Sequence, residues 1–95
     1  MMNDIDSLIA KIQKMREDHD WQTSDTPNTL AKSIVIEANE LLEAFMTENI
    51  DMDIVKSELA DVLMYALSLG HDLDLDIEEL IEQKIIEVNT RTYDE

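Results

Sequence analysis

The 95-residue sequence contains no cysteine, one glycine and one proline. Without cysteine it has no disulfide, no thiolate metal site and no cysteine nucleophile, which agrees with a reducing compartment. With one glycine and one proline it has few of the residues that build tight β-turns. A compact helical domain is therefore the default expectation.

Positive charge is also scarce, because 7 lysines and arginines stand against 23 acidic residues and give a net charge of −16. Seven dispersed cations cannot form the basic stripe that binds nucleic acid, and the same charge disfavours anionic membranes. No apolar run approaches membrane-spanning length, and the N-terminal residues lack the features of an export signal. Because 44% of the residues are hydrophobic, the chain is not a disordered acidic tail. We expect a soluble cytoplasmic protein with no nucleic-acid or membrane partner.

Apolar residues recur at spacings of three and four in four segments, a pattern typical of amphipathic helices. Helices are predicted over about residues 3–19, 29–48, 51–69 and 77–91. Asp51 or Asp53 is expected to cap the third helix and Gly70 to end it, while Asp76 and Glu79 form a capping box at the fourth. The residues expected to face inward include Ile12, Leu30, Leu42, Phe45, Val55, Leu59, Leu63, Leu80, Ile81 and Ile85. Residues 1–95 are thus predicted to form one all-α, four-helix bundle-like domain.

Three apolar residues lie away from these main stripes. At about 100° per residue, Ile36, Met64 and Ile86 each point away from the apolar centre of their own helix. Together they suggest a second apolar face. A short chain also buries only a modest core, and association is one way to complete it. The sequence therefore predicts a dimer or a higher oligomer.

Four acidic residues lie where solvated acids are not expected. Glu37 falls on the edge of the apolar stripe of the second predicted helix, and Glu40 is one step further round. In the third helix, Glu58 and Asp61 repeat this arrangement, with Tyr65 between their directions. Each pair spans one helical turn on a single face.

Carboxylates at the edge of a core repel one another and lose hydration. Both effects destabilise the fold unless a nearby cation compensates. The two helices that carry them offer one lysine each, Lys32 and Lys56. All-oxygen ligands suit Mg²⁺, with Mn²⁺ as an alternative. A di-iron centre is disfavoured, because such bundles use Glu-x-x-His and no histidine follows these acids by three residues. The sequence therefore predicts a divalent metal site.

Lys84 falls in the middle of the apolar stripe of the fourth predicted helix, and Arg91 lies on nearly the same line two turns later. An inward lysine can pair with one of the four acids, or it can hold a phosphate group, and the two interpretations carry equal weight. Because Mg²⁺ in proteins is usually held by a few carboxylates together with substrate phosphates, the second interpretation points to a polyphosphate substrate.

These residues resemble the MazG-type nucleoside triphosphate pyrophosphohydrolases, members of the all-α NTP pyrophosphatase superfamily. The resemblance covers about residues 15–93 and rests on Trp21, Thr26, Leu30, the pairs Glu37/Glu40 and Glu58/Asp61, Tyr65, Lys84 and Arg91. It implies an all-α homodimer or dimer of dimers that hydrolyses nucleoside triphosphates to monophosphate and pyrophosphate with Mg²⁺.

The resemblance also implies residue roles. Glu37, Glu40, Glu58 and Asp61 would be the catalytic metal ligands. Tyr65, Lys84 and Arg91 would support or contact the nucleotide and its phosphates, and Trp21 would lie near the base.

Three alternatives stay open. A phosphoribosyl-ATP pyrophosphohydrolase would be expected to have a glycine before the first glutamate pair, whereas the single glycine here is Gly70. A dimeric dUTP or dCTP hydrolase of the same superfamily is a second alternative, because the choice of base depends on a loop. A non-catalytic acidic interaction module would use Glu37, Glu58 and Lys84 as a buried ion network, and unlike an enzyme it would gain no specific stability from divalent metal.

Overall fold

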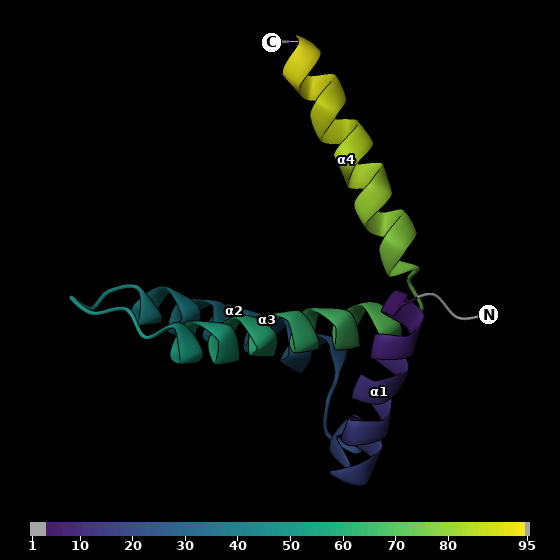
Figure 1. Ribbon diagram of the computed structural model, residues 1–95. Helices are drawn as coiled ribbons and strands as arrows, with labels where there is room; N and C mark the ends of the chain where they lie inside the picture. The colour runs from purple at the N-terminus through teal and green to yellow at the C-terminus, as the bar shows by residue number, and fades with distance from the viewer. Residues whose placement is uncertain (1–3, 95) are drawn as a thin grey trace.

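The computed structural model describes residues 4–94, which form four α-helices and one short 3₁₀ helix (Figure 1). In chain order these elements are α1 (Asp4–Asp18), η1 (Trp21–Thr23), α2 (Pro27–Ala44), α3 (Met52–Asp72) and α4 (Ile77–Asp94). No strand occurs within the described residues, so the all-α, four-helix prediction is confirmed. Residue 3, where the first helix was predicted to begin, lies outside the described residues, as do the ends of the predicted 1–95 domain.

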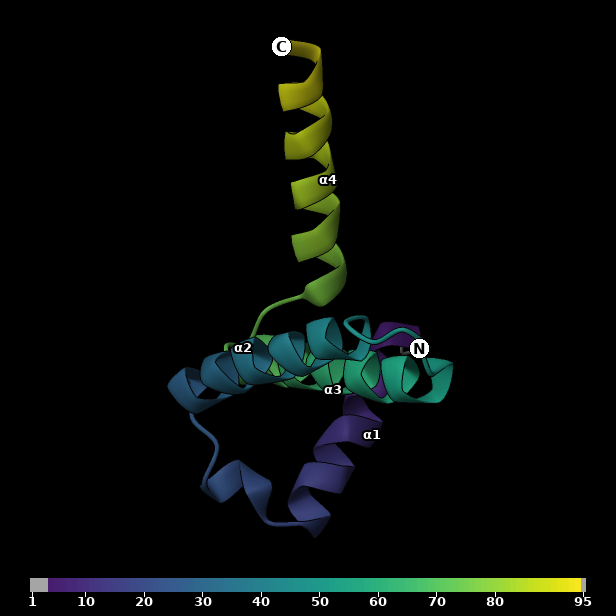
Figure 2. The same cartoon turned by 90° about the vertical axis from the view of Figure 1, so that its left-hand side faces the viewer.

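The centre of the fold is a hairpin of α2 and α3, which lie side by side along most of their length (Figures 1 and 2). Helix α1 packs against α3, and it leaves the hairpin on the opposite side from α4. The buried apolar side chains are Ile12 of α1, Leu30 of α2 and Val55 of α3. Leu30 lies in the first turn of α2 and Val55 in the first turn of α3, so the buried residues are spread along the hairpin rather than gathered at one point.

Local capping explains where the helices start. Thr26 and Thr29 form a capping box at α2, each side-chain oxygen accepting a hydrogen bond from the other residue's backbone N–H. This box places Pro27 in the first turn, so α2 begins two residues earlier than predicted. At α3 the Asp51 side chain accepts from the Asp53 N–H at 2.9 Å. At α4 the Asp76 side chain accepts from the Glu79 N–H at 3.1 Å, which is the N-cap half of the predicted capping box.

The ends of α2 and α3 differ from prediction. Helix α2 ends at Ala44 rather than near residue 48. Helix α3 continues past Gly70 to Asp72, so the predicted stop at Gly70 is wrong. Gly70 is buried inside the helix, and a Cβ atom there would collide with Cδ1 of Ile77. This glycine therefore allows the start of α4 to approach α3 closely rather than ending a helix.

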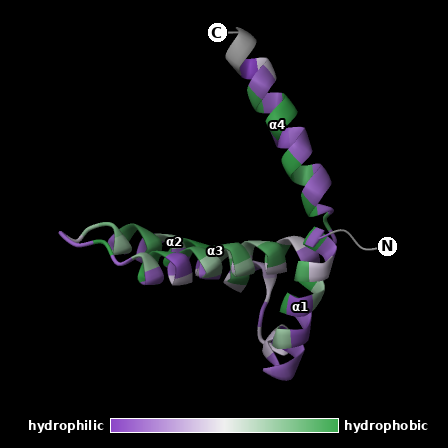
Figure 3. Cartoon of the chain, viewed as in Figure 1, coloured by the Kyte–Doolittle hydropathy of each residue, from purple (hydrophilic) through white to green (hydrophobic). Residues whose placement is uncertain are grey.

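Helix α4 projects from the hairpin and contacts α3 only near their connection (Figure 1). Hydrophobic stretches run along α2 and α3 and recur in bands along α4 (Figure 3). Of the residues predicted to face inward, Ile12, Leu30 and Val55 are buried. Others are exposed in the isolated chain, among them Leu42, Phe45, Leu59, Leu63, Leu80, Ile81 and Ile85. The stripes exist as predicted, but this chain alone does not cover them.

The outlying apolar residues divide into two groups. Ile36 and Ile86 are exposed, whereas Met64 is half-buried and lines a cavity.

None of the described helices combines the length and the apolar character needed to cross a membrane.

Candidate metal centre

Three carboxylates meet where α2 faces α3. Glu37 and Glu40 of α2 and Glu58 of α3 each offer an oxygen atom, and these atoms all lie within 4.8 Å of one another. The structure thus brings together three of the four predicted metal ligands.

Helix periodicity explains this placement. Glu37 lies two turns after Leu30, which is 1% exposed, so both side chains point toward α3. Glu58 lies one turn after the buried Val55 and points back toward α2. The apolar contacts that hold the hairpin together therefore also direct these acids at one another.

The inward carboxylates are poorly compensated by the protein. Glu37 and Glu58 are half-buried, and Oε2 of each is buried without a hydrogen-bond partner among the described residues. None of the ion pairs found within residues 4–94 involves the three glutamates. Orphaned carboxylate oxygens on facing helices are a donor set that fits a divalent cation.

The pKa values of Glu37 and Glu58 reflect the crowding of these carboxylates. Burial, followed by the neighbouring Glu40 carboxyl and the charges of Asp61 and Glu58, raises the pKa of Glu37 to about 7 from its ordinary value of 4.5. Burial and the Glu40 carboxyl also raise the pKa of Glu58. Near neutral pH, the protein alone therefore resists full ionisation of the site.

Asp61 and Tyr65 continue the site along α3. Asp61 is not one of the three clustered carboxylates, but its charge contributes to the raised pKa of both Glu37 and Glu58. Burial, followed by the charge of Glu37, raises the pKa of Tyr65. Both residues line a small cavity of about 70 Å³ together with Trp21. Trp21, predicted to lie near the base, thus shares a cavity with Asp61, and its predicted role stays a prediction.

A wider groove borders the other side of the cluster. It has a volume of about 490 Å³, and its lining includes Glu40 and Glu58 together with the turn between α2 and α3. Asp61 therefore borders the small, partly apolar cavity, whereas Glu40 and Glu58 border the open acidic groove.

The structure does not bring the predicted basic residues to this site. Lys84 lies in the apolar stripe of α4 beside Ile81 and Ile85, as predicted, but its side chain is 62% exposed and pairs with Glu87 at 2.8 Å. Arg91 is exposed further along the same projecting helix. The buried network of Glu37, Glu58 and Lys84 expected for a non-catalytic module is not formed within this chain.

Arg16 is a further residue of this region that was not predicted from the sequence. Its side chain is 2% exposed, and its two terminal nitrogens donate to both carboxylate oxygens of Asp72 at 3.0 and 2.7 Å. Asp25 lies 3.6 Å from the same guanidinium. These contacts tie α1 and the η1 loop to the end of α3. The available signal was that Arg16 lies one turn after Ile12 on the apolar face of the first helix.

Comparison with known proteins agrees with this geometry. A model of the MazG-like family matches residues 32–94, which is about two thirds of the chain and includes all four predicted ligands. Among solved structures, a pyrophosphatase from Archaeoglobus fulgidus matches with a TM-score of 0.82 and 31% sequence identity, over 100% of this chain and 96% of that one. Comparison with curated proteins gives no match. The chain therefore belongs to the MazG-like family.

Proposed function

We propose that this protein is a Mg²⁺-dependent nucleoside triphosphate pyrophosphohydrolase, which hydrolyses ribo- or deoxynucleoside triphosphates to the monophosphate and pyrophosphate. The observation that carries the proposal is the cluster of Glu37, Glu40 and Glu58, whose inward oxygens have no cationic partner among the described residues. The similarity to a pyrophosphatase supports the reaction class.

The four carboxylates are assigned to metal binding. Glu37, Glu40, Glu58 and Asp61 hold the divalent ions, with Mn²⁺ as a substitute for Mg²⁺. When bound, these ions supply positive charge for the phosphates and lower the pKa of a coordinated water. This role is needed because the groove beside the cluster is itself lined by acids, including Glu43 and Asp51, which repel a triphosphate.

The reaction balances as a hydrolysis. A water oxygen forms a bond to the α-phosphorus, and the bond from that phosphorus to the α–β bridging oxygen breaks. One of the site carboxylates accepts the proton of the water, and pyrophosphate leaves with the electron pair of the broken bond. In this arrangement the phosphates lie at the carboxylates, Tyr65 supports them, and the base lies toward Trp21.

We also propose that the active form is a homodimer or a dimer of dimers. The isolated chain leaves Ile81, Ile85 and Val88 of α4 exposed, and hydrophobic residues of the hairpin are exposed as well. A second copy is the favoured occupant, because Lys84 and Arg91 lie on this projecting helix while the hairpin carries the uncompensated acids. In such an assembly these two basic residues would reach the phosphates of a neighbouring site. The cytoplasmic location expected from the sequence stays a prediction.

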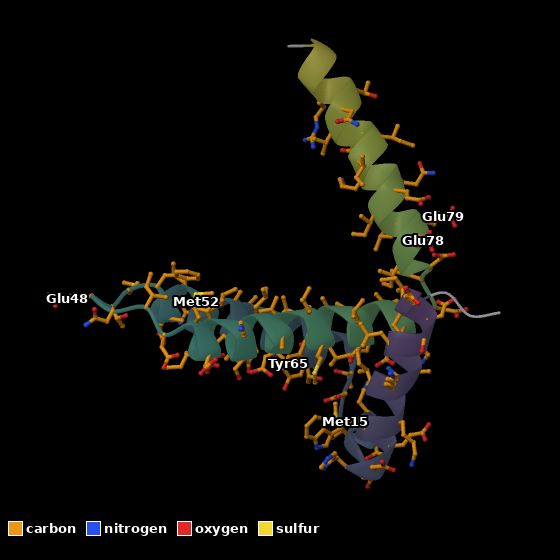
Figure 4. All side chains as sticks on the ribbon, in the orientation of Figure 1. Met15, Glu48, Met52, Tyr65, Glu78 and Glu79 are labelled. Carbon is orange, nitrogen blue, oxygen red and sulfur yellow. The ribbon has the colours of Figure 1, made fainter. Side chains whose placement is uncertain are left out.

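The proposal is tested by incubating the purified protein with Mg²⁺ and a panel of nucleoside triphosphates and separating the products by chromatography. Monophosphate and pyrophosphate are expected as the products. Glu40→Ala and Asp61→Ala should abolish turnover while the helical circular dichroism signal is retained. Glu48→Gln is the matched control, since Glu48 lies at the exposed tip of the hairpin (Figure 4) and should leave activity unchanged. A fully active Glu40→Ala protein would refute the assignment.

A further inference from the structure

The loop between α1 and α2 forms one wall of the cavity that Asp61 and Tyr65 line. This η1 loop, residues 19–26, contributes Trp21 and Asp25 to that wall. The cavity lies in the corner between α3 and α1, which Tyr65 and Met15 border in Figure 4. The position of the loop therefore decides how closed the structure is at the edge of the acidic site.

The η1 loop is held together by its own hydrogen bonds. The backbone N–H groups of Ser24 and Asp25 both donate to the Trp21 carbonyl, at 3.1 and 2.9 Å. The Thr23 hydroxyl donates to the Asp20 carbonyl at 2.9 Å. A segment bonded in this way keeps its own shape when it moves, so its position against α3 depends on the contacts that it makes with other elements.

Arg16 makes such a contact, and it binds its two partners differently. Its buried guanidinium donates to both carboxylate oxygens of Asp72 on α3, at 3.0 and 2.7 Å. Asp25 of the η1 loop lies 3.6 Å from Nη2 of the same guanidinium, which is longer than the roughly 3 Å of an N–H···O hydrogen bond. The fork with Asp72 thus fixes α1 against α3, while a longer and weaker ion pair holds the loop.

The charge of Asp25 reaches the site itself. Burial raises the pKa of Tyr65, followed by the charges of Glu37 and Asp25. Asp25 and Asp61 also line the same cavity, in which Arg16 is the one basic residue among the described lining residues. The Arg16 charge offsets that of Asp25, and without it the Asp25 carboxylate would be repelled by the neighbouring acid.

We infer that Arg16 is a positioning residue for the proposed reaction, because its ion pair with Asp25 holds the η1 loop closed against α3. When this ion pair breaks, the loop opens while the fork with Asp72 keeps α1 in place. The inference rests on the proposed function and adds a loop that controls access to its site. Since substrate binds productively only to the closed fraction of molecules, a loop that is open more of the time raises KM.

The position of the loop can be measured without an activity assay, because Trp21 is the single tryptophan of the sequence. Its side chain is 41% exposed, so acrylamide quenches its fluorescence only partly when the loop is closed. Asp25→Ala removes the ion pair and leaves the fork with Asp72, so the quenching constant should rise by up to about twofold as the ring becomes more exposed. Lys14→Met, which removes an exposed ion pair on the same helix, is the control and should not change the quenching. Unchanged quenching in Asp25→Ala would overturn the inference.

The kinetic test separates the position of the loop from the stability of the fold. With the best substrate of the nucleoside triphosphate panel, Asp25→Ala should raise KM about fivefold, while kcat and the rise in melting temperature on adding Mg²⁺ persist. Asp72→Asn weakens the link between α1 and α3 but keeps the ion pair with Asp25, so it should lower the melting temperature and leave KM unchanged.

The outcomes distinguish this inference from the proposed function. An unchanged KM in Asp25→Ala, or an equal rise of KM in Asp72→Asn, would overturn the role of Arg16 and leave the proposed function standing. If the wild-type protein hydrolyses no nucleoside triphosphate, the proposed function fails and the role of Arg16 in the reaction fails with it. The quenching measurement would then still show whether the ion pair holds the loop.

Discussion

Glu37 of α2 and Glu58 of α3 face each other with carboxylate oxygens within 4.8 Å, and each buries one oxygen that has no hydrogen-bond partner among the described residues. Two facing acids of this kind destabilise a protein unless a cation joins them. The relationship therefore connects the stability of the fold to the binding of metal, and it can be tested without an enzymatic assay.

The stability of the metal-free protein should fall as pH rises from about 4.5 to about 7. Glu37 titrates near 4.5 when unfolded, but its pKa in the folded chain is about 7 because of burial and its acidic neighbours. Between these values the folded state binds more protons than the unfolded state, so the free energy of unfolding decreases with pH. Thermal unfolding in EDTA across this range measures the effect. Glu37→Gln removes the titrating group, and an unchanged slope in that variant would contradict the explanation.

Divalent metal should reverse this loss above neutral pH. A cation that binds only the folded state adds about 2.7 kcal/mol to the free energy of unfolding at one hundred times its Kd. The melting temperature in Mg²⁺ or Mn²⁺ is compared with that in NaCl of equal ionic strength. Glu58→Gln should remove the specific shift, and Glu48→Gln should retain it. A shift in Glu58→Gln as large as in the wild type would show that the metal binds elsewhere.

Arg16→Met should destabilise the protein by about 3 kcal/mol near neutral pH, because it leaves the half-buried Asp72 carboxylate without its partner. Hydrogen bonds from Arg16 lower the pKa of Asp72 below its ordinary value of 3.8. The contribution of the pair is therefore present above that value and is lost as pH falls through the lowered pKa. Urea unfolding of both proteins at neutral and acidic pH measures the difference, which should shrink in acid. Lys14→Met, which removes the exposed ion pair with Asp18, is the control and should change little.

Gly70→Ala should be stabilising only after Ile77 is shortened. Alanine gains roughly 0.5–1 kcal/mol over glycine in a helix interior, but its Cβ would collide with Cδ1 of Ile77. Ile77→Val removes that atom, so the double variant should be more stable than Ile77→Val alone, while Gly70→Ala by itself should be neutral or destabilised. Additive effects in a double-mutant cycle would show that the collision has no energetic cost, because Cδ1 of Ile77 turns aside.

Much of the fold was predictable because it is set by local signals. Apolar periodicity indicated four helices, and the N-caps at Asp51 and Asp76 followed from their side chains. The reciprocal Thr26–Thr29 box was not anticipated, so α2 began earlier than expected. Gly70 was misinterpreted because a glycine can end a helix or permit close packing, and the choice depends on Ile77, which only the tertiary fold brings near.

The acidic part of the site was predictable from the sequence, whereas the basic residues were not. The spacing of Glu37, Glu40 and Glu58 placed them on facing helix surfaces, and the hairpin brought them together. Lys84 was expected to point inward because it lies in an apolar stripe, but within one chain that stripe has no cover. Arg16 was overlooked because its partner is 56 residues away, and no local pattern encodes such a contact.

The most direct test of the proposed function is hydrolysis of a nucleoside triphosphate in ¹⁸O-labelled water with Mg²⁺, followed by mass spectrometry of both products. Attack at the α-phosphorus places one ¹⁸O in the nucleoside monophosphate and none in pyrophosphate, and Glu37→Gln and Glu58→Gln should abolish this product. Label in pyrophosphate, release of inorganic phosphate, or full activity of the glutamate variants would contradict the proposal.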